Sequence, residues 1–199
     1  MELKKKGELN EAEKIVILLH GRGATAEGIL EITEKLSEAC YIAPQAPGGT
    51  WYPQSFMAPR KQNQPELEKA LETLSQTVEK ASEHVEKEKI ILLGFSQGAC
   101  LASEYIAKNT AKNNLGGLIV FSGGLIGEEI ESFNGHLDKM PVFIGCSEKD
   151  PHIPLERVNE TAEVFKQLNA EVEKYIMEGS SHGIDGYELD QAYKIINNV

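Results

Sequence analysis

The most constraining feature of this sequence is a serine-centred segment at residues 94–98, Gly-Phe-Ser-Gln-Gly. An unbroken apolar run, residues 90–93, precedes it, and a segment rich in small residues follows at 99–106. This order predicts a buried strand, an abrupt turn and a helix packed closely on the strand. Glycines flank the serine because the strand and the helix pass too close for side chains. Such a turn lifts the serine clear of the backbone, so Ser96 is the candidate nucleophile.

Apolar runs of strand length alternate with helix-like segments along the rest of the chain. Further strands are expected at residues 15–19, 41–43, 118–121, 141–144 and 172–177, the last half-exposed and near an edge. The clearest amphipathic helix begins at Pro65, and residues 1–14 are compatible with a short edge hairpin. The alternation predicts a single α/β domain over residues 1–199, with a mostly parallel central sheet and helices on both faces.

For two of the expected helices, the sequence predicts which side chains face the sheet. Thr25 can cap a helix whose inward face would carry Ile29, Ile32, Leu36 and Ala39. The last helix of the chain is expected to direct four side chains inward: Leu189, Ala192, Tyr193 and Ile196. Residues 125–139 show no such pattern and are expected to form a loop, with room for one short helical turn.

The composition narrows the class of protein. At 199 residues and 41% hydrophobic, the chain can bury one sizeable core, and no apolar run approaches the length of a membrane span or signal peptide. The net charge of −11 would repel nucleic acid and anionic membrane surfaces. Cys40, Cys100 and Cys146 are odd in number and lack metal-ligand spacing, which predicts buried thiols of a cytoplasmic protein. No metal or other cofactor is expected.

Residues 44–65 break all periodicity and concentrate prolines and glycines. A loop of this length in a compact domain is usually functional or disordered. Trp51, Tyr52, Phe56 and Met57 argue against disorder, because such side chains normally cover an apolar surface. The loop therefore either forms one wall of a substrate pocket or packs on the core, and the sequence favours neither reading.

A serine hydroxyl needs a base to take its proton, and that base must itself be oriented. His182 lies in a loop between the last strand and the last helix, which would place it at the same sheet edge as Ser96. His136 precedes a strand and would lie at the other edge, and His152 is too near the candidate acid to be held by it. We therefore expect His182 to be the base.

The candidate acid is Asp150, in a loop after another strand that two prolines stiffen. Its carboxylate would accept the second imidazole N–H, which fixes the tautomer and stabilises the imidazolium. Glu148 lies on the same loop and is the competitor. The chain order Ser96, Asp150, His182 is the one expected for this serine-hydrolase architecture.

An oxyanion needs hydrogen-bond donors, and two backbone amides are candidates. The Gln97 N–H follows the nucleophile directly, and the second N–H is expected from Arg22, in the loop after the first buried strand. Only the backbone of Arg22 is needed, so its side chain is either solvated or attracts a substrate carboxylate. His20, on the same loop, is expected to brace that loop and not to act as a second base.

With these residues the chain resembles the phospholipase/carboxylesterase family of α/β-hydrolases, which includes the acyl-protein thioesterases, from about Ile15 onward. The resemblance rests on Leu-His-Gly-Arg-Gly at residues 19–23, the serine motif, Phe-Ser-Gly at 121–123, Asp-Pro-His-Ile-Pro at 150–154 and His-Gly at 182–183. It implies metal-free hydrolysis of esters or thioesters through an acyl-enzyme on Ser96. Residues expected to line the substrate pocket are Gly21, Gly23, Trp51, Tyr52, Phe56, Met57 and Ile153.

Two departures from the family pattern bear on the substrate. Thioesterase-like members usually carry an acidic residue where Pro53 follows the aromatic pair, and an apolar residue where Arg22 stands. Both positions touch the acyl pocket and its entrance, so small to medium acyl esters are expected. The alternatives are a lysophospholipase or thioesterase acting on longer chains, a lactone hydrolase, and a non-catalytic binding protein. The expected partner is a small-molecule ester or thioester, without nucleic acid or stable membrane insertion, and a homodimer is left open.

Overall fold

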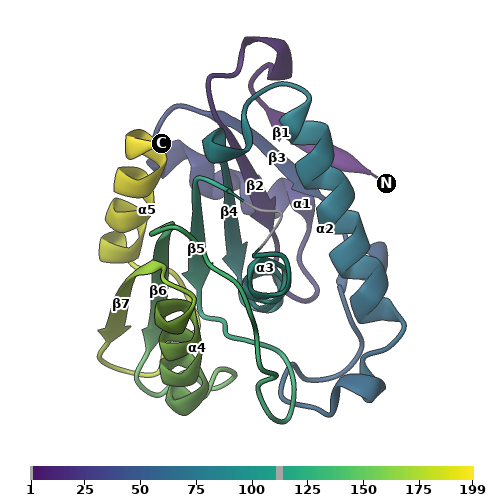
Figure 1. The fold of residues 1–199 in the computed structure, drawn as a ribbon, viewed down its shortest axis with the longest axis vertical. Helices are drawn as coiled ribbons and strands as arrows, with labels where there is room; N and C mark the ends of the chain where they lie inside the picture. Colours follow the sequence, from purple (N-terminus) through teal and green to yellow (C-terminus); the bar gives the residue numbers. More distant parts are fainter. Residues whose placement is uncertain (1, 111–113) are drawn as a thin grey trace.

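The computed structural model describes residues 2–110 and 114–199 (Figure 1). Within them, seven strands form one sheet in the order β1-β3-β2-β4-β5-β6-β7. The strands are β1 (Leu3–Lys6), β2 (Ile15–Leu19), β3 (Cys40–Pro44), β4 (Ile90–Phe95), β5 (Gly117–Phe121), β6 (Pro141–Ser147) and β7 (Glu171–Met177). Only β1 pairs antiparallel, with β3, and the other pairs are parallel. The expected mostly parallel sheet is confirmed.

Helices cover both faces of the sheet, as expected (Figure 1). They are α1 (Ala26–Leu30), α2 (Glu66–Ser82), α3 (Gln97–Lys108), α4 (Leu155–Gln167) and α5 (Gly186–Asn198). One apolar cluster joins the sheet to α2, α3 and α4, and a second joins it to α1 and α5. No helix of the described residues is long and apolar enough to cross a bilayer.

The central strands are apolar on both faces because successive side chains alternate between the two clusters. In β2, Ile15, Ile17 and Leu19 join the cluster under α2, α3 and α4, whereas Val16 and Leu18 join the other. This double burial explains why these strands are unbroken apolar runs in the sequence and do not alternate with polar residues.

The structure corrects several local expectations. Residues 3–6 form a single strand that pairs with β3, so no hairpin forms within residues 2–14. Thr25 does cap α1, its Oγ1 accepting from the Gly28 N–H at 3.0 Å, but α1 ends at Leu30 and a short 3₁₀ helix (Glu31–Lys35) replaces its continuation. Residues 125–139 contain no helix or strand, as expected.

Of the four side chains expected to point inward from α5, Ala192 and Ile196 are buried, Leu189 is half-buried, and the expectation for Tyr193 is wrong. Tyr193 is 47% exposed, and the buried positions are Glu188, Gln191, Ala192 and Ile196. Glu188 is inward because it completes a capping box: Asp185 accepts from the Glu188 N–H, and Glu188 Oε2 accepts from the Asp185 N–H, both at 2.8 Å. The periodicity could not indicate this, because a buried carboxyl looks like a polar surface residue in the sequence.

Burial of Glu188 makes stability depend on pH. Its side chain is fully buried, and Oε1 has no hydrogen-bond partner among the described residues. Burial raises the pKa of this carboxyl to about 7, and the nearby Asp185 and Asp150 carboxylates add to the rise. Between its ordinary pKa and about 7, the unfolded chain therefore binds fewer protons at this residue than the folded chain, so stability falls as pH rises.

We expect Glu188→Gln to remove this pH dependence, because glutamine keeps an acceptor for the Asp185 N–H without the charge. The gain in unfolding free energy over the wild type should be below about 1 kcal/mol at pH 5 and grow to about 3 kcal/mol at pH 8.5. Urea unfolding of both proteins at several pH values measures it. A difference between the two proteins that does not change with pH would contradict the assignment.

Candidate active site

Ser96 stands alone between β4 and α3 in a conformation that few non-glycine residues adopt. Its φ of 54° and ψ of −119° place it outside the usual regions for L-residues, a strain that persists only where the surroundings impose it. The surroundings are tight: a Cβ on Gly94 would lie 2.5 Å from the Ala99 Cα, and one on Gly98 would lie 2.1 Å from the Leu19 carbonyl oxygen. The close strand–helix crossing expected from the two glycines is thus present.

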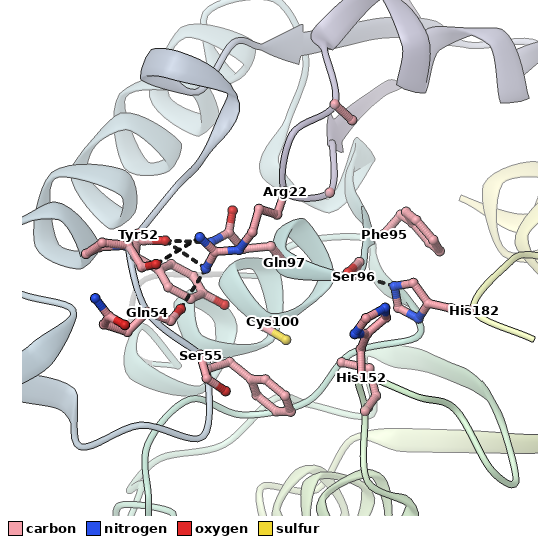
Figure 2. Close-up of a pocket in the computed structure, with 15 residues that line it drawn as sticks. Arg22, Tyr52, Gln54, Ser55, Phe95, Ser96, Gln97, Cys100, His152 and His182 are labelled. Atoms are coloured by element: carbon pink, nitrogen blue, oxygen red, sulfur yellow. Dashed lines mark hydrogen bonds between the residues drawn. The ribbon is translucent and has the colours of Figure 1, made fainter. Parts of the chain in front are cut away.

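Three side chains from separate loops meet at the carboxyl edge of the sheet. The Ser96 Oγ lies 2.9 Å from His182 Nε2, and His182 Nδ1 lies 2.7 Å from Asp150 Oδ2 (Figure 2 shows the first of these bonds). Since Asp150 accepts from Nδ1–H, His182 Nε2 is left as the acceptor for the serine hydroxyl. The carboxylate at the imidazole is that of Asp150, and the competing Glu148 is exposed.

The Asp150 carboxylate is held on both oxygens. Oδ2 accepts from His182, and Oδ1 accepts from the backbone N–H groups of His152 at 2.8 Å and Ile153 at 3.0 Å. Burial by itself would raise the pKa of Asp150, but these three hydrogen bonds outweigh it and hold the pKa below its usual value. The group therefore stays ionised at neutral pH, as a partner for an imidazolium must.

The backbone around Ser96 presents amide donors. Gln97 is the first residue of α3, and the first N–H groups of a helix have no acceptor within the helix. The turn after β2 lies against the serine, because a Cβ on Gly21 would be 3.3 Å from the Ser96 Cβ. The Arg22 amide therefore belongs to a turn that contacts the serine.

The Arg22 side chain braces the loop that follows β3. Its Nη1 donates to the Pro53 carbonyl at 2.9 Å, and its Nη2 donates to those of Tyr52 at 3.0 Å and Gln54 at 2.6 Å (Figure 2). The guanidinium carbon also lies 5.9 Å from the centre of the Tyr52 ring. Of the two roles left open by the sequence, the solvated one holds in part: Arg22 is exposed, and its guanidinium also donates to backbone carbonyls of the loop.

The Gln97 side chain also forms hydrogen bonds with the loop that follows β3. Its Oε1 accepts from the Thr50 hydroxyl at 3.1 Å and the Trp51 N–H at 3.0 Å, and its Nε2 donates to the Tyr52 carbonyl at 2.7 Å. The two residues whose amides are candidate oxyanion donors thus both hold residues 50–54 with their side chains. A shift of residues 50–54 would therefore also shift the backbone amides of Arg22 and Gln97.

A cavity of about 520 Å³ opens at the serine (Figure 2). Of the residues expected to line it, four do: Gly21, Tyr52, Phe56 and Ile153. Pro53, expected at the pocket or its entrance, lines it too, and the wall also includes residues that sequence reasoning did not single out for it, namely Ala24, Gln54, Ser55, Phe95, Cys100 and His152. Most of these flank predicted site residues along the chain, which is the only signal that could have found them.

The remaining three expected pocket residues lie elsewhere. Trp51 is buried in the core, where its indole N–H donates to the His20 carbonyl at 2.9 Å. The Gly23 N–H donates to the Gly49 carbonyl at 2.7 Å, and half-buried Met57 packs on the core edge. Both readings of the loop therefore hold in part, since Tyr52 and Phe56 face the cavity while Trp51 packs inward.

His20 is fully buried under this loop. Its Nδ1 donates to the Gly21 carbonyl at 2.8 Å, and its Nε2 accepts from the Ala46 N–H at 3.1 Å. Burial lowers the pKa of this imidazole, so it stays neutral with both nitrogens engaged. This geometry fits the bracing role expected for it.

The cysteines are buried free thiols, as expected. Burial raises the pKa of Cys100 to about 12 and that of Cys146 to about 12, so neither supplies a thiolate at neutral pH. Within residues 2–110 and 114–199, no group of three or more histidine, cysteine, aspartate or glutamate side chains is arranged to hold a metal ion.

A mostly parallel sheet covered by helices on both faces, with a serine at the sharp turn after a central strand, defines an α/β-hydrolase. A family model described as Phospholipase/Carboxylesterase matches residues 6–199. The chain therefore belongs to the phospholipase/carboxylesterase family.

Individual relatives agree with this placement. A phospholipase/carboxylesterase structure from Dyadobacter fermentans is 39% identical, with a TM-score of 0.92 over 98% of this chain and 96% of that chain. Acyl-protein thioesterase 1 of Candida albicans is 28% identical over 218 residues, which cover 96% of this chain and 94% of that protein. The Bacillus cereus carboxylesterase shares the fold, with 18% identity and a TM-score of 0.81 over 100% of this chain and 94% of that chain. The family and these relatives indicate a hydrolase.

Proposed function

We propose that this protein is a serine carboxylesterase that hydrolyses small to medium acyl esters without a metal or other cofactor. The observation that carries the proposal is the continuous hydrogen-bond chain from the Ser96 hydroxyl through His182 to Asp150. Such a chain lets a hydroxyl lose its proton at the moment it attacks a carbonyl carbon.

In the first half of the reaction, His182 Nε2 takes the proton as Ser96 Oγ bonds to the acyl carbon. The carbonyl oxygen becomes an oxyanion, which accepts from the backbone N–H groups of Gln97 and Arg22. Collapse of this intermediate breaks the bond to the alcohol oxygen, and His182 gives its proton to that oxygen. The alcohol leaves, and the acyl group stays on Ser96 as an ester.

In the second half, a water molecule attacks the acyl-enzyme and loses its proton to His182. Collapse releases the carboxylic acid, and the proton returns to Ser96 Oγ. Asp150 keeps its charge throughout and stabilises the imidazolium in both halves. The charge of −11 on the chain and its three free, buried cysteines also support a cytoplasmic location, which is part of the same proposal.

Chain length separates this function from the alternative of a lysophospholipase or thioesterase, which the similarity to acyl-protein thioesterase 1 favours. We expect kcat/KM on 4-nitrophenyl esters to peak at short to medium acyl chains and to fall beyond them, because Arg22 stands in the cavity wall where thioesterase-like members usually carry an apolar residue. A kcat/KM that keeps rising to palmitate, or a faster reaction with palmitoyl thioesters, would favour the alternative.

The Arg22 brace is expected to matter for the rate and less for stability. Arg22→Met removes three hydrogen bonds to the loop and frees the turn that carries the Arg22 amide, so kcat should fall about 10- to 100-fold. Arg22→Lys should recover part of the loss. Lys61→Met, an exposed change on the same loop, serves as the matched control. Equal kcat values in the two methionine variants would argue against the brace.

A further inference from the structure

The proposed reaction defines the side of the cavity that the alcohol occupies. His182 Nε2 must reach the departing oxygen to protonate it, so the leaving group lies beside the His182 ring. The His152 ring meets the His182 ring edge to face, with centroids 4.8 Å apart and planes at 77° (Figure 2). His152 also lines the cavity. A leaving group protonated by His182 therefore passes within reach of the His152 imidazole.

The His152 backbone is fixed while its side chain is available. Its N–H donates to Asp150 Oδ1 at 2.8 Å, and the next residue, Ile153, is buried. The residue itself is exposed, and within residues 2–110 and 114–199 its ring nitrogens have no hydrogen-bond partner. An imidazole in either charge state has at least one N–H to donate to an oxygen. An unpaired N–H donor on a fixed backbone thus lines the cavity beside His182.

The charge around the cavity differs from that of the whole chain. The protein carries 31 acidic residues and a net charge of −11, yet no aspartate or glutamate of the described part of the chain lines the cavity. Its basic side chains are Arg22, His152 and His182. An anionic group is repelled by most of the surface of such a protein, but less by this wall, where Arg22 carries a permanent cation and the neighbouring Asp150 carboxylate is already paired with His182.

We propose that His152 is a specificity residue that binds an acidic oxygen group, carboxylate or phosphate, on the alcohol half of the ester. This inference rests on the proposed esterase function and narrows its substrate class to esters whose alcohol carries such an acid close to the ester bond. The acid accepts from a His152 ring N–H while His182 protonates the alcohol oxygen.

Three butyrate esters test the proposal: phenyl butyrate as the neutral reference, 3-carboxyphenyl butyrate and 3-phosphooxyphenyl butyrate. His152→Phe keeps an aromatic ring against His182 but removes the N–H. We expect the ratio of kcat/KM for an acidic ester to that for phenyl butyrate to fall about tenfold in this variant. A fall confined to the carboxylate ester or to the phosphate ester identifies which acid the site takes.

His136→Phe is the matched control, because His136 is an exposed histidine in the loop before β6, paired with Asp138. The ratio should not change in this control. An unchanged ratio in His152→Phe, with all three esters slowed equally or none slowed, would overturn the proposal and leave the ring as a support for His182. If the wild-type protein hydrolyses none of the esters at a rate above that of Ser96→Ala, the esterase function itself fails, and this inference fails with it.

Discussion

Ser96→Ala is expected to lower kcat for a short-chain ester by about 10⁴-fold or more, with little change in the midpoint of thermal unfolding. The Oγ is the only non-hydrogen atom removed, and without it no acyl-enzyme can form. The amide donors and the cavity would still provide a small residual rate over water. Ser132→Ala, at an exposed serine away from the cavity, is the control and should retain full activity.

Asp150→Asn tests the hydrogen-bond chain from Ser96 through His182 at its carboxylate end. The amide can keep the two backbone hydrogen bonds from His152 and Ile153, but it can no longer hold the imidazole in the productive tautomer. We expect kcat to fall by about 10⁴-fold, nearly as far as for the serine variant. Combining the two changes should add little, because the residues act as one unit. Multiplying losses in the double variant would show that they act separately.

The largest expected effect on stability is that of Gly98→Ala. Its methyl group would lie 2.1 Å from the Leu19 carbonyl oxygen and 2.7 Å from that of His20. Both atoms are backbone at the end of β2, a fully buried strand, and cannot rotate away. We expect a loss of at least about 3 kcal/mol in unfolding free energy, or failure to accumulate as folded protein.

Gly186→Ala is the matched control for this change. It opens α5, and a methyl group there would meet nothing within 4 Å. Alanine should therefore be neutral or stabilise by up to about 1 kcal/mol. Urea unfolding of the two variants beside the wild type measures the contrast. Equal stabilities would mean that the strand and the helix are farther apart than the structure has them.

The fold could be predicted from the sequence because the signals for its strands and for the serine turn are local and strong. The apolar runs that became β2, β4 and β5 are buried on both faces, so pattern and environment agree. Gly94 and Gly98 were equally informative, since only a close crossing of the strand and the helix requires glycine at both positions. Asp150 and His182 were selected by topology, because the carboxyl ends of parallel strands share one edge.

The sequence could not predict which contacts individual side chains make. Nothing in the pattern distinguishes a guanidinium that binds backbone carbonyls, as Arg22 does, from one in solvent, because the acceptors have no side-chain signature. Trp51 and Tyr52 are neighbours of similar character, yet one packs inward and the other faces the cavity. Carboxylates are usually exposed, but Glu188 is buried because it forms a capping box with Asp185, three residues earlier.

The central claim is that one serine, activated by an imidazole that a carboxylate holds, attacks the acyl carbon. Incubation with a fluorophosphonate, followed by peptide mass spectrometry, tests it most directly. The account predicts one adduct per chain, on the peptide that contains Ser96, forming at a rate that falls steeply in Asp150→Asn. An unlabelled protein, or an adduct on any other residue with Ser96 intact, would contradict it.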